Sequence, residues 1–184
     1  MDSDKILVEK CAKGDRKAQR ALYDLYAGKM LVVALRYTKT QLEAEDVLQE
    51  SFIKVFEKIK TFRAESELRF WIKKIVVNTA LNNQRSKLYM FPMVDVENVN
   101  KAYDSDISLS SFHFTELLKF IQELPTGCQA IFNLYAIEGY NHKEIASMLN
   151  ISEGTSKSQY SRARTLLQER IEKEQLIGYE RAKQ

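Results

Sequence analysis

The chain has 184 residues, of which 45% are hydrophobic, enough to bury the core of one ordinary domain or of two small ones. Its two prolines and six glycines are few, which argues against an all-β chain with many tight turns. The 28 basic and 25 acidic residues leave a net charge of only +3, which does not by itself indicate a nucleic-acid partner. No segment approaches the roughly 18–20 apolar residues that cross a bilayer, so we expect a cytoplasmic protein without membrane insertion.

The two cysteines give no sign of a metal site. Cys11 and Cys128 lie far apart in the chain and outside any metal-ligand spacing. This pattern favours small buried thiols in a reducing cytosol. We therefore expect no cofactor and no metal.

Helical periodicity dominates the chain and predicts an all-α fold. The expected helices, in chain order, are 4–12, 16–36, 41–59, 67–85, 114–123, 126–137, 142–149 and 153–176. The long interruption in the middle is acidic, rich in serine and asparagine, and without a sustained period, as is typical of a linker. The chain is predicted to form two small helical domains, residues 1–90 and 112–184, joined by an acidic linker at 91–111.

Helix 41–59 is predicted to have one apolar and one acidic face. The apolar face consists of Ala44, Val47, Leu48, Phe52, Val55 and Ile59. The opposite face carries Asp46, Gln49, Glu50 and Ile53. An isoleucine inside an exposed acidic patch suggests a protein contact, although a single stray exposed isoleucine is an equally good explanation.

Helix 67–85 is predicted to carry a nucleic-acid surface. One stripe, spaced by three and four residues, contains Trp71, Lys74, Asn78, Asn82 and Arg85. The remaining positions, expected in the core, are Phe70, Ile72, Ile75, Val76, Val77, Ala80 and Leu81. Aromatic rings stack on bases, amides read base edges and cations follow the backbone, so the stripe suits single-stranded nucleic acid. The alternative is that Trp71 is simply a core aromatic.

Residues 142–176 are predicted to form a helix-turn-helix. Asn150 and Ile151 make the turn, and Ser152 is a good N-cap for the second helix. The buried side of that helix is expected to contain Ser156, Tyr160, Ala163, Leu167 and Ile171. The outer side presents Ser158, Ser161, Arg162 and Thr165, with Lys157 and Arg164 on one flank. Small, hydroxylated and basic residues suit a recognition helix in the DNA major groove, whereas a solvated basic face is the alternative.

Residues 43–86 and 123–167 resemble regions 2 and 4 of the bacterial extracytoplasmic-function (ECF) sigma factors. In the first stretch, the family element DxxQExF is represented by Asp46, Gln49, Glu50 and Phe52. The family pattern FR…W…VN is represented by Phe62, Arg63, Trp71, Val77 and Asn78. In the second stretch, GTSKSQ…SRAR occupies the recognition helix. The matches follow the order and spacing of the family and extend over both predicted domains.

The resemblance implies an RNA polymerase sigma factor that directs core polymerase to promoters and promotes DNA melting without catalysing a reaction. The implied partners are core polymerase, through its β′ clamp and β flap, promoter DNA and an anti-sigma factor. The acidic linker resembles the family segment that threads the polymerase cleft and the RNA exit path.

The resemblance also implies the site residues. The surface that docks on the β′ clamp would be Asp46, Gln49, Glu50 and Ile53. Phe62, Arg63 and Asn78 would hold a base flipped out of the −10 element. The adjoining single strand would lie along Trp71, Lys74, Asn82 and Arg85. The −35 duplex would be read by Lys157, Ser158, Ser161 and Arg162, with Arg164 beside them.

Three positions depart from the common family pattern. In the recognition helix, Ser156 and Gln159 stand where many members of the family have a β-branched apolar residue and an arginine. In the loop before helix 67–85, Ala64 replaces the glycine of the commoner family motif RGES or RGDS. These departures leave the −35 and −10 sequence preferences open.

Three other functions account for less of the sequence, and of these an interaction adaptor would leave both basic stripes unexplained. A helix-turn-helix regulator that binds DNA independently of polymerase would use only the C-terminal domain and would give Phe62 and Asn78 no role. An enzyme is disfavoured, because His113 and His142 have no nucleophile or ligand partner at motif spacing, and no Gly-rich phosphate loop is present.

Overall fold

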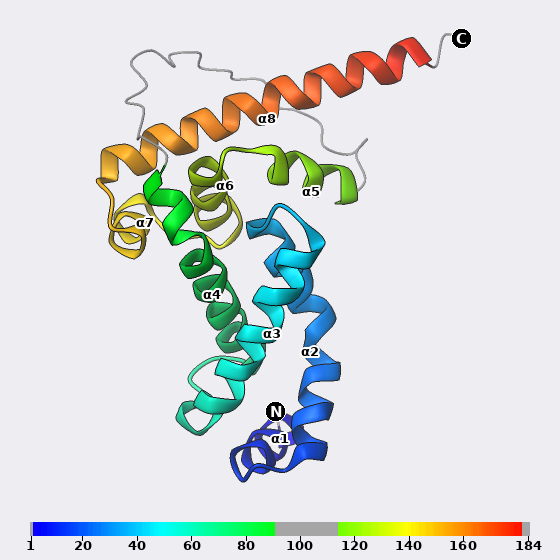
Figure 1. Cartoon of the computed structure of the whole chain (residues 1–184), viewed down its shortest axis with the longest axis vertical. Coiled ribbons are helices and arrows are strands. Elements are labelled where there is room, and N and C mark those ends of the chain that lie inside the picture. Colours follow the sequence, from blue (N-terminus) through cyan, green and yellow to red (C-terminus); the bar gives the residue numbers. More distant parts are fainter. Residues whose placement is uncertain (1, 91–113, 182–184) are drawn as a thin grey trace. The chain divides into compact units, whose positions relative to one another are not determined.

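The computed structural model describes the backbone of residues 2–90 and 114–181, and the side chains of residues 4–84 and 114–176. The described residues are helical and contain no strand, as predicted (Figure 1). The chain forms two compact units, Met1–Ser86 and Lys87–Gln184. The predicted linker, residues 91–111, lies outside the described residues.

The first unit contains four α-helices and a short 3₁₀ turn. They are α1 (Asp2–Ala12), α2 (Arg16–Tyr37), α3 (Gln41–Lys58), η1 (Ile59–Thr61) and α4 (Leu68–Met90). Side chains placed just before the helices start them: Asp15 accepts hydrogen bonds from two amides of α2, and Thr40 accepts one from α3. Helices α2 and α3 lie side by side, and each of α2, α3 and α4 has a buried side (Figure 1). Hydrogen bonds from Lys54 to Thr79 and from Asn83 to Glu50 join α3 to α4.

The second unit contains the remaining helices. They are α5 (Phe114–Glu123), α6 (Thr126–Phe132), η3 (Asn133–Ile137), α7 (His142–Leu149) and α8 (Glu153–Arg181). Leu124, Cys128 and Ala163 form a buried cluster between α6 and α8. An ion pair of 3.0 Å between Arg170 and Glu123 joins α8 to the end of α5. In the part of the chain that the structure describes, none of the helices is both long and apolar enough to cross a membrane.

Most helix ends lie within two residues of the predicted ones, but three predicted helices differ by more. The predicted helix 126–137 is α-helical only to Phe132 and then widens into the π-helical turn η3, where the Glu138 amide donates to the Asn133 carbonyl. The predicted helices 67–85 and 153–176 continue to Met90 and Arg181. Hydrophobic periodicity does not predict a π-helical turn or the last residues of a fraying helix.

Candidate nucleic-acid and protein interfaces

The outer side of α3 presents an apolar and acidic surface to solvent. The predicted apolar face is buried, with Val55 and Ala44 at 0% exposure, which turns Asp46 and Gln49 outward. Ile53 is 59% exposed on the same side. Sequence reasoning overlooked Leu42, which is 70% exposed and lies one turn before Asp46. We define the α3 surface as Leu42, Asp46, Gln49 and Ile53; the spacing of four, three and four would have identified Leu42 as its fourth member.

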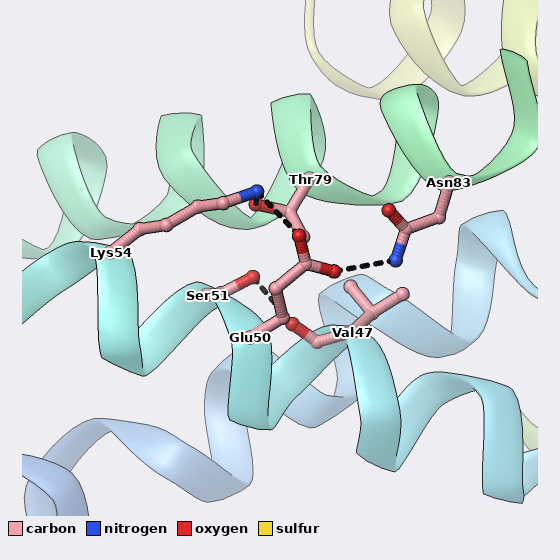
Figure 2. Close-up of polar contacts among 6 residues, drawn as sticks. All are labelled: Val47, Glu50, Ser51, Lys54, Thr79 and Asn83. Atoms are coloured by element: carbon pink, nitrogen blue, oxygen red, sulfur yellow. Dashed lines mark hydrogen bonds and ion pairs between the residues drawn. The ribbon is translucent and has the colours of Figure 1, made fainter.

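Glu50 differs from these residues because both of its carboxylate oxygens already have partners. The Lys54 ammonium donates to one oxygen at 2.7 Å, and the Asn83 amide of α4 donates to the other at 2.8 Å (Figure 2). Lys54 also donates to the Thr79 hydroxyl of α4 at 3.3 Å. The bond from Lys54, followed by that from Asn83, lowers the pKa of Glu50 below its usual value. Glu50 therefore braces α3 against α4 and is half-buried.

The predicted stripe of α4 lies on its outer side. Lys74, Asn78 and Asn82 are exposed, whereas the opposite side of the helix, with Ile72 and Val76, is fully buried. Trp71 is half-buried. Arg85 belongs to α4, but its side chain lies outside the described residues.

The loop before α4 brings an aromatic ring to the start of the stripe. Phe62 packs edge-on against Trp71, with ring centroids 5.5 Å apart and an angle of 60° between the rings. Arg63 is exposed, and its guanidinium lies 4.0 Å from the Glu65 carboxylate. Ala64 has a φ of 56°, in the left-handed region that glycine favours.

Phe70 is not in the core, where the sequence analysis placed it. The ring is 44% exposed. The guanidinium carbon of Arg69 lies 4.4 Å from its centroid, and the Lys73 ammonium lies 5.6 Å away. Helical periodicity groups Phe70 with Val77, which is buried two turns later, so the period alone predicted burial for both; the packing that covers Val77 does not extend to Phe70 in the first turn of α4.

The turn between α7 and α8 has the predicted chemistry. Asn150 ends α7 in the left-handed conformation, with φ 55° and ψ 50°. The Ser152 hydroxyl accepts a hydrogen bond of 2.9 Å from the Thr155 amide and thereby caps the start of α8. At the start of α7, Asn141 and Glu144 form a capping box. The capping box and the Ser152 cap set the residues at which α7 and α8 begin.

The inner side of α8 is the predicted one, and its outer side is open to a partner. Ser156, Ala163 and Ile171 are buried. On the outer side, Lys157 and Arg164 are exposed, while Ser158, Ser161 and Arg162 are half-exposed. The Ser158 hydroxyl donates to the Thr155 carbonyl at 3.1 Å. The Lys157 ammonium forms an ion pair of 2.7 Å with Glu153, one turn earlier.

Two of the residues that depart from the family pattern have interior partners. The Ser156 hydroxyl lies 2.9 Å from Nδ1 of His142, and the Cys128 thiol donates to Oε1 of Gln159 at 2.9 Å. The His142 ring is half-buried and stacks on Tyr135, with centroids 4.3 Å apart. Burial, and then the nearby Lys157, lower the pKa of His142. Ser156 and Gln159 therefore join α8 to α7 and α6.

The described side chains thus form three separate surfaces: an apolar and acidic one on α3, an aromatic, amide and cationic one on α4, and a small, hydroxylated and basic one on α8. The first suits a basic, partly apolar protein surface. The second can stack unpaired bases and the third can enter a major groove.

Two protein families match the chain, one after the other. Residues 22–88 match the family described as Sigma-70 region 2, and residues 114–167 match Sigma-70, region 4. The chain is 31% identical to the ECF RNA polymerase sigma-E factor of Haemophilus influenzae, over 92% of this chain and 96% of that protein. It is 29% identical to the protein of the same name from Escherichia coli, over 92% and 95% of the two chains.

A solved structure has a similar fold. It is the sigma factor RpoE of Bartonella quintana in complex with the anti-sigma factor NepR, with 22% identity and a TM-score of 0.51. The similarity extends over 82% of this chain and 94% of that one.

Proposed function

The chain belongs to the ECF group of sigma-70 family RNA polymerase sigma factors, and from this premise we propose how its parts divide the work of promoter recognition. The first domain, residues 1–90, binds core polymerase and captures the melted −10 element. The second domain, residues 112–184, reads the −35 element as duplex. The acidic segment 91–111 links them. The chain itself catalyses no reaction.

The observation that carries the proposal is the outer side of α4. An amide–cation line of Lys74, Asn78 and Asn82 is exposed there and begins at the Phe62–Trp71 ring pair. Stacking a base on an aromatic ring contributes roughly 1–3 kcal/mol. Extruding a base from a duplex costs a few kcal/mol, so capture of unpaired bases on this surface offsets the cost of melting.

Within this surface, the residues have different roles. Phe62 and Arg63 in the loop, with Asn78 on α4, receive the flipped base: a ring stacks on it and an amide bonds to its edge. Trp71 stacks on the neighbouring base. Lys74, Asn82 and Arg85 follow the backbone and edges of the same strand.

The outer side of α8 contacts the −35 duplex. Arg162 is placed to read a base edge, and a bidentate contact with guanine contributes about 1–3 kcal/mol of discrimination. Ser158 and Ser161 are short enough to let the helix approach the bases. Lys157 and Arg164 bind phosphates, and Lys157 must exchange its Glu153 partner for DNA.

The protein partners follow from the remaining surfaces. Core polymerase docks on Asp46, Gln49, Glu50 and Ile53 through a basic surface of its β′ clamp, and its β flap binds the second domain. Because the similar Bartonella quintana sigma factor was solved with an anti-sigma factor, we infer that a cytoplasmic anti-sigma factor restrains this chain too.

Transcription in vitro with purified core polymerase on a promoter library tests the function and identifies the preferred promoter. Asp46→Lys should abolish holoenzyme formation and transcription, because it places a cation against a basic partner. Glu9→Lys on α1 is the matched control, since Glu9 is also exposed and the charge change is the same. If Asp46→Lys binds core polymerase as tightly as the unsubstituted protein does, the assignment of Asp46 to the docking surface is wrong.

A further inference from the structure

We propose that Cys128 helps to set the −35 selectivity of this protein, because it holds Gln159 of α8 against α6 and away from the bases. Cys128 is a positioning residue in this inference, since it acts through Gln159 and does not itself touch DNA. The inference rests on the proposed function of α8 and refines it: Arg162 and the serines beside it read the duplex without a contribution from Gln159.

The direction of the Gln159 side chain is the first observation. Its Oε1 accepts a hydrogen bond of 2.9 Å from the Cys128 thiol, which lies 31 positions earlier in the chain. The same amide lies over Gly127, where an added Cβ atom would be 3.7 Å from Oε1 and 3.9 Å from Cδ of Gln159. Both contacts are with the first turn of α6, so the carbonyl end of the half-buried side chain points toward α6.

The fixed position of the thiol is the second observation. Cys128 is 0% exposed and belongs to the buried cluster that it forms with Leu124 and Ala163. A side chain packed in this cluster cannot follow Gln159 outward, so turning the amide toward DNA would break the hydrogen bond. A thiol is only a weak donor, and the bond therefore acts together with the packing of the amide against Gly127.

The place of Gln159 on α8 gives this contact its consequence. Gln159 follows Ser158 directly and precedes Arg162 by three positions, so it lies on a flank of the outer side. A glutamine amide that is turned toward DNA pairs with adenine, and its carbonyl oxygen accepts from the adenine amino group. With Oε1 directed at Cys128, Gln159 does not make this pair. A side chain that could select adenine is thus withheld from the duplex.

The test measures binding of holoenzyme to promoter duplexes in which each −35 base pair is changed in turn. Gln159→Ala should leave both the affinity and the ranking of these duplexes unchanged. Cys128→Ala should release the amide and raise the relative affinity for adenine at one −35 position by about 5-fold or more, the low end of a bidentate base contact. A second substitution, Gln159→Ala, should cancel that gain.

Two further variants serve as controls for the loss of the thiol. Cys128→Ser keeps a donor at this position and should retain the original ranking of the −35 duplexes. Cys11→Ala removes the other buried thiol, which lies in the first unit, and should retain the ranking as well.

Gln159→Arg tests the same contact without leaving a cavity at Cys128. A guanidinium has no acceptor for the thiol, so the arginine should leave α6 and bind a phosphate. The affinity for every −35 duplex should then rise, and the slope of log affinity against log salt should steepen by about 0.9. An unchanged salt slope would contradict the inference.

The outcomes separate this inference from the proposed function. If Gln159→Ala alone weakens binding to one −35 sequence more than to the others, Gln159 already reads that base and the inference is wrong. It is also wrong if Cys128→Ala leaves the ranking unchanged, or if Cys128→Ser shifts the ranking as Cys128→Ala does. If Arg162→Ala changes neither affinity nor ranking, the proposed function of α8 fails and the inference fails with it.

Discussion

Ala64 adopts a backbone conformation that its side chain disfavours. Its φ of 56° lies in the left-handed region, where the Cβ atom meets the following carbonyl at a cost of about 1–2 kcal/mol. The residue lies in the loop between η1 and α4, directly after Phe62 and Arg63, which we assign to the flipped base. The surrounding fold therefore holds the loop in a conformation that the backbone of Ala64 disfavours.

Replacing Ala64 with glycine should raise the free energy of unfolding of the first unit. The relief of strain exceeds the greater chain entropy of glycine, and we expect a net gain of up to about 1 kcal/mol. Ala64→Val should instead lower it by about 1 kcal/mol or more, since a β-branched residue fits this region worse. Denaturant titration followed by fluorescence of Trp71, the only tryptophan, reports on this unit. Equal midpoints for all three proteins would show that the loop is unstrained.

His142 makes the second unit sensitive to pH. Burial and Lys157 lower its pKa, while Glu153 raises it less, and the ring is held between Tyr135 and the Ser156 hydroxyl. An unfolded histidine titrates near about pH 6.5. Below that pH the unfolded chain binds more protons than the folded one, so the stability is lost as the pH falls.

We therefore expect the free energy of unfolding of the second unit to decrease from about pH 7.5 to about pH 5.5. The decrease should be smaller in a His142→Asn variant, and thermal unfolding followed by tyrosine circular dichroism would measure it. His113→Asn removes the chain's other histidine and should keep the full decrease. A decrease that persists undiminished in His142→Asn would rule out this residue as its source.

At the scale of elements, Glu50 connects α3, to which we assign polymerase docking, to α4, to which we assign binding of the melted strand. Its two oxygens are bonded by Lys54 on α3 and Asn83 on α4, and Lys54 reaches Thr79 on α4 as well (Figure 2). A basic residue of polymerase that approaches Glu50 would compete with these donors. Glu50 can thus both contact polymerase and hold α4 in place, and two substitutions separate the roles.

Asn83→Ala should lower the free energy of unfolding of the first unit by about 1 kcal/mol, because it removes one bond to a charged acceptor. It should leave the affinity for core polymerase unchanged or slightly higher, since Glu50 keeps its charge and gains a free oxygen. Glu50→Gln should lower both quantities. Asn82→Ala is the control, because Asn82 is exposed and adjacent to Asn83. If Asn83→Ala and Glu50→Gln lose equal affinity for core polymerase, Glu50 acts only by holding α3 and α4 together.

Helix positions and inner faces could be predicted from the sequence because they depend on local periodicity. The inner side of α8 and the turn at Asn150 are examples. Partners far apart in the chain could not be predicted in this way. The Glu50–Asn83 bond spans 33 residues and the Cys128–Gln159 bond spans 31, and only the packing of whole helices brings such pairs together. Phe70 was misplaced for a related reason: period alone does not show where neighbouring helices stop covering α4.

At the scale of the whole molecule, the chain forms two compact units, and we assign one of the two proposed DNA surfaces to each. Two weak binding sites on one chain add little affinity for DNA that carries both elements unless something sets their separation. When polymerase holds both domains, the second DNA contact becomes intramolecular, and avidity can rise by about 10²- to 10⁴-fold. The free chain should therefore be a poor promoter binder even though both of its surfaces are intact.

Promoter DNA with both elements should bind the free chain about as weakly as a −35 duplex fragment alone. In the presence of core polymerase, the same DNA should bind at least about 10²-fold more tightly than either element on its own fragment. Inserting five base pairs between the elements turns the −35 face away by about half a helical turn and should abolish that gain. Fluorescence anisotropy at constant salt measures each of these affinities, because phosphate contacts make all of them salt-dependent. A large gain from joining the elements in the absence of polymerase would mean that the chain itself fixes the spacing of its two domains, and the spacer insertion would then penalise the free chain as well.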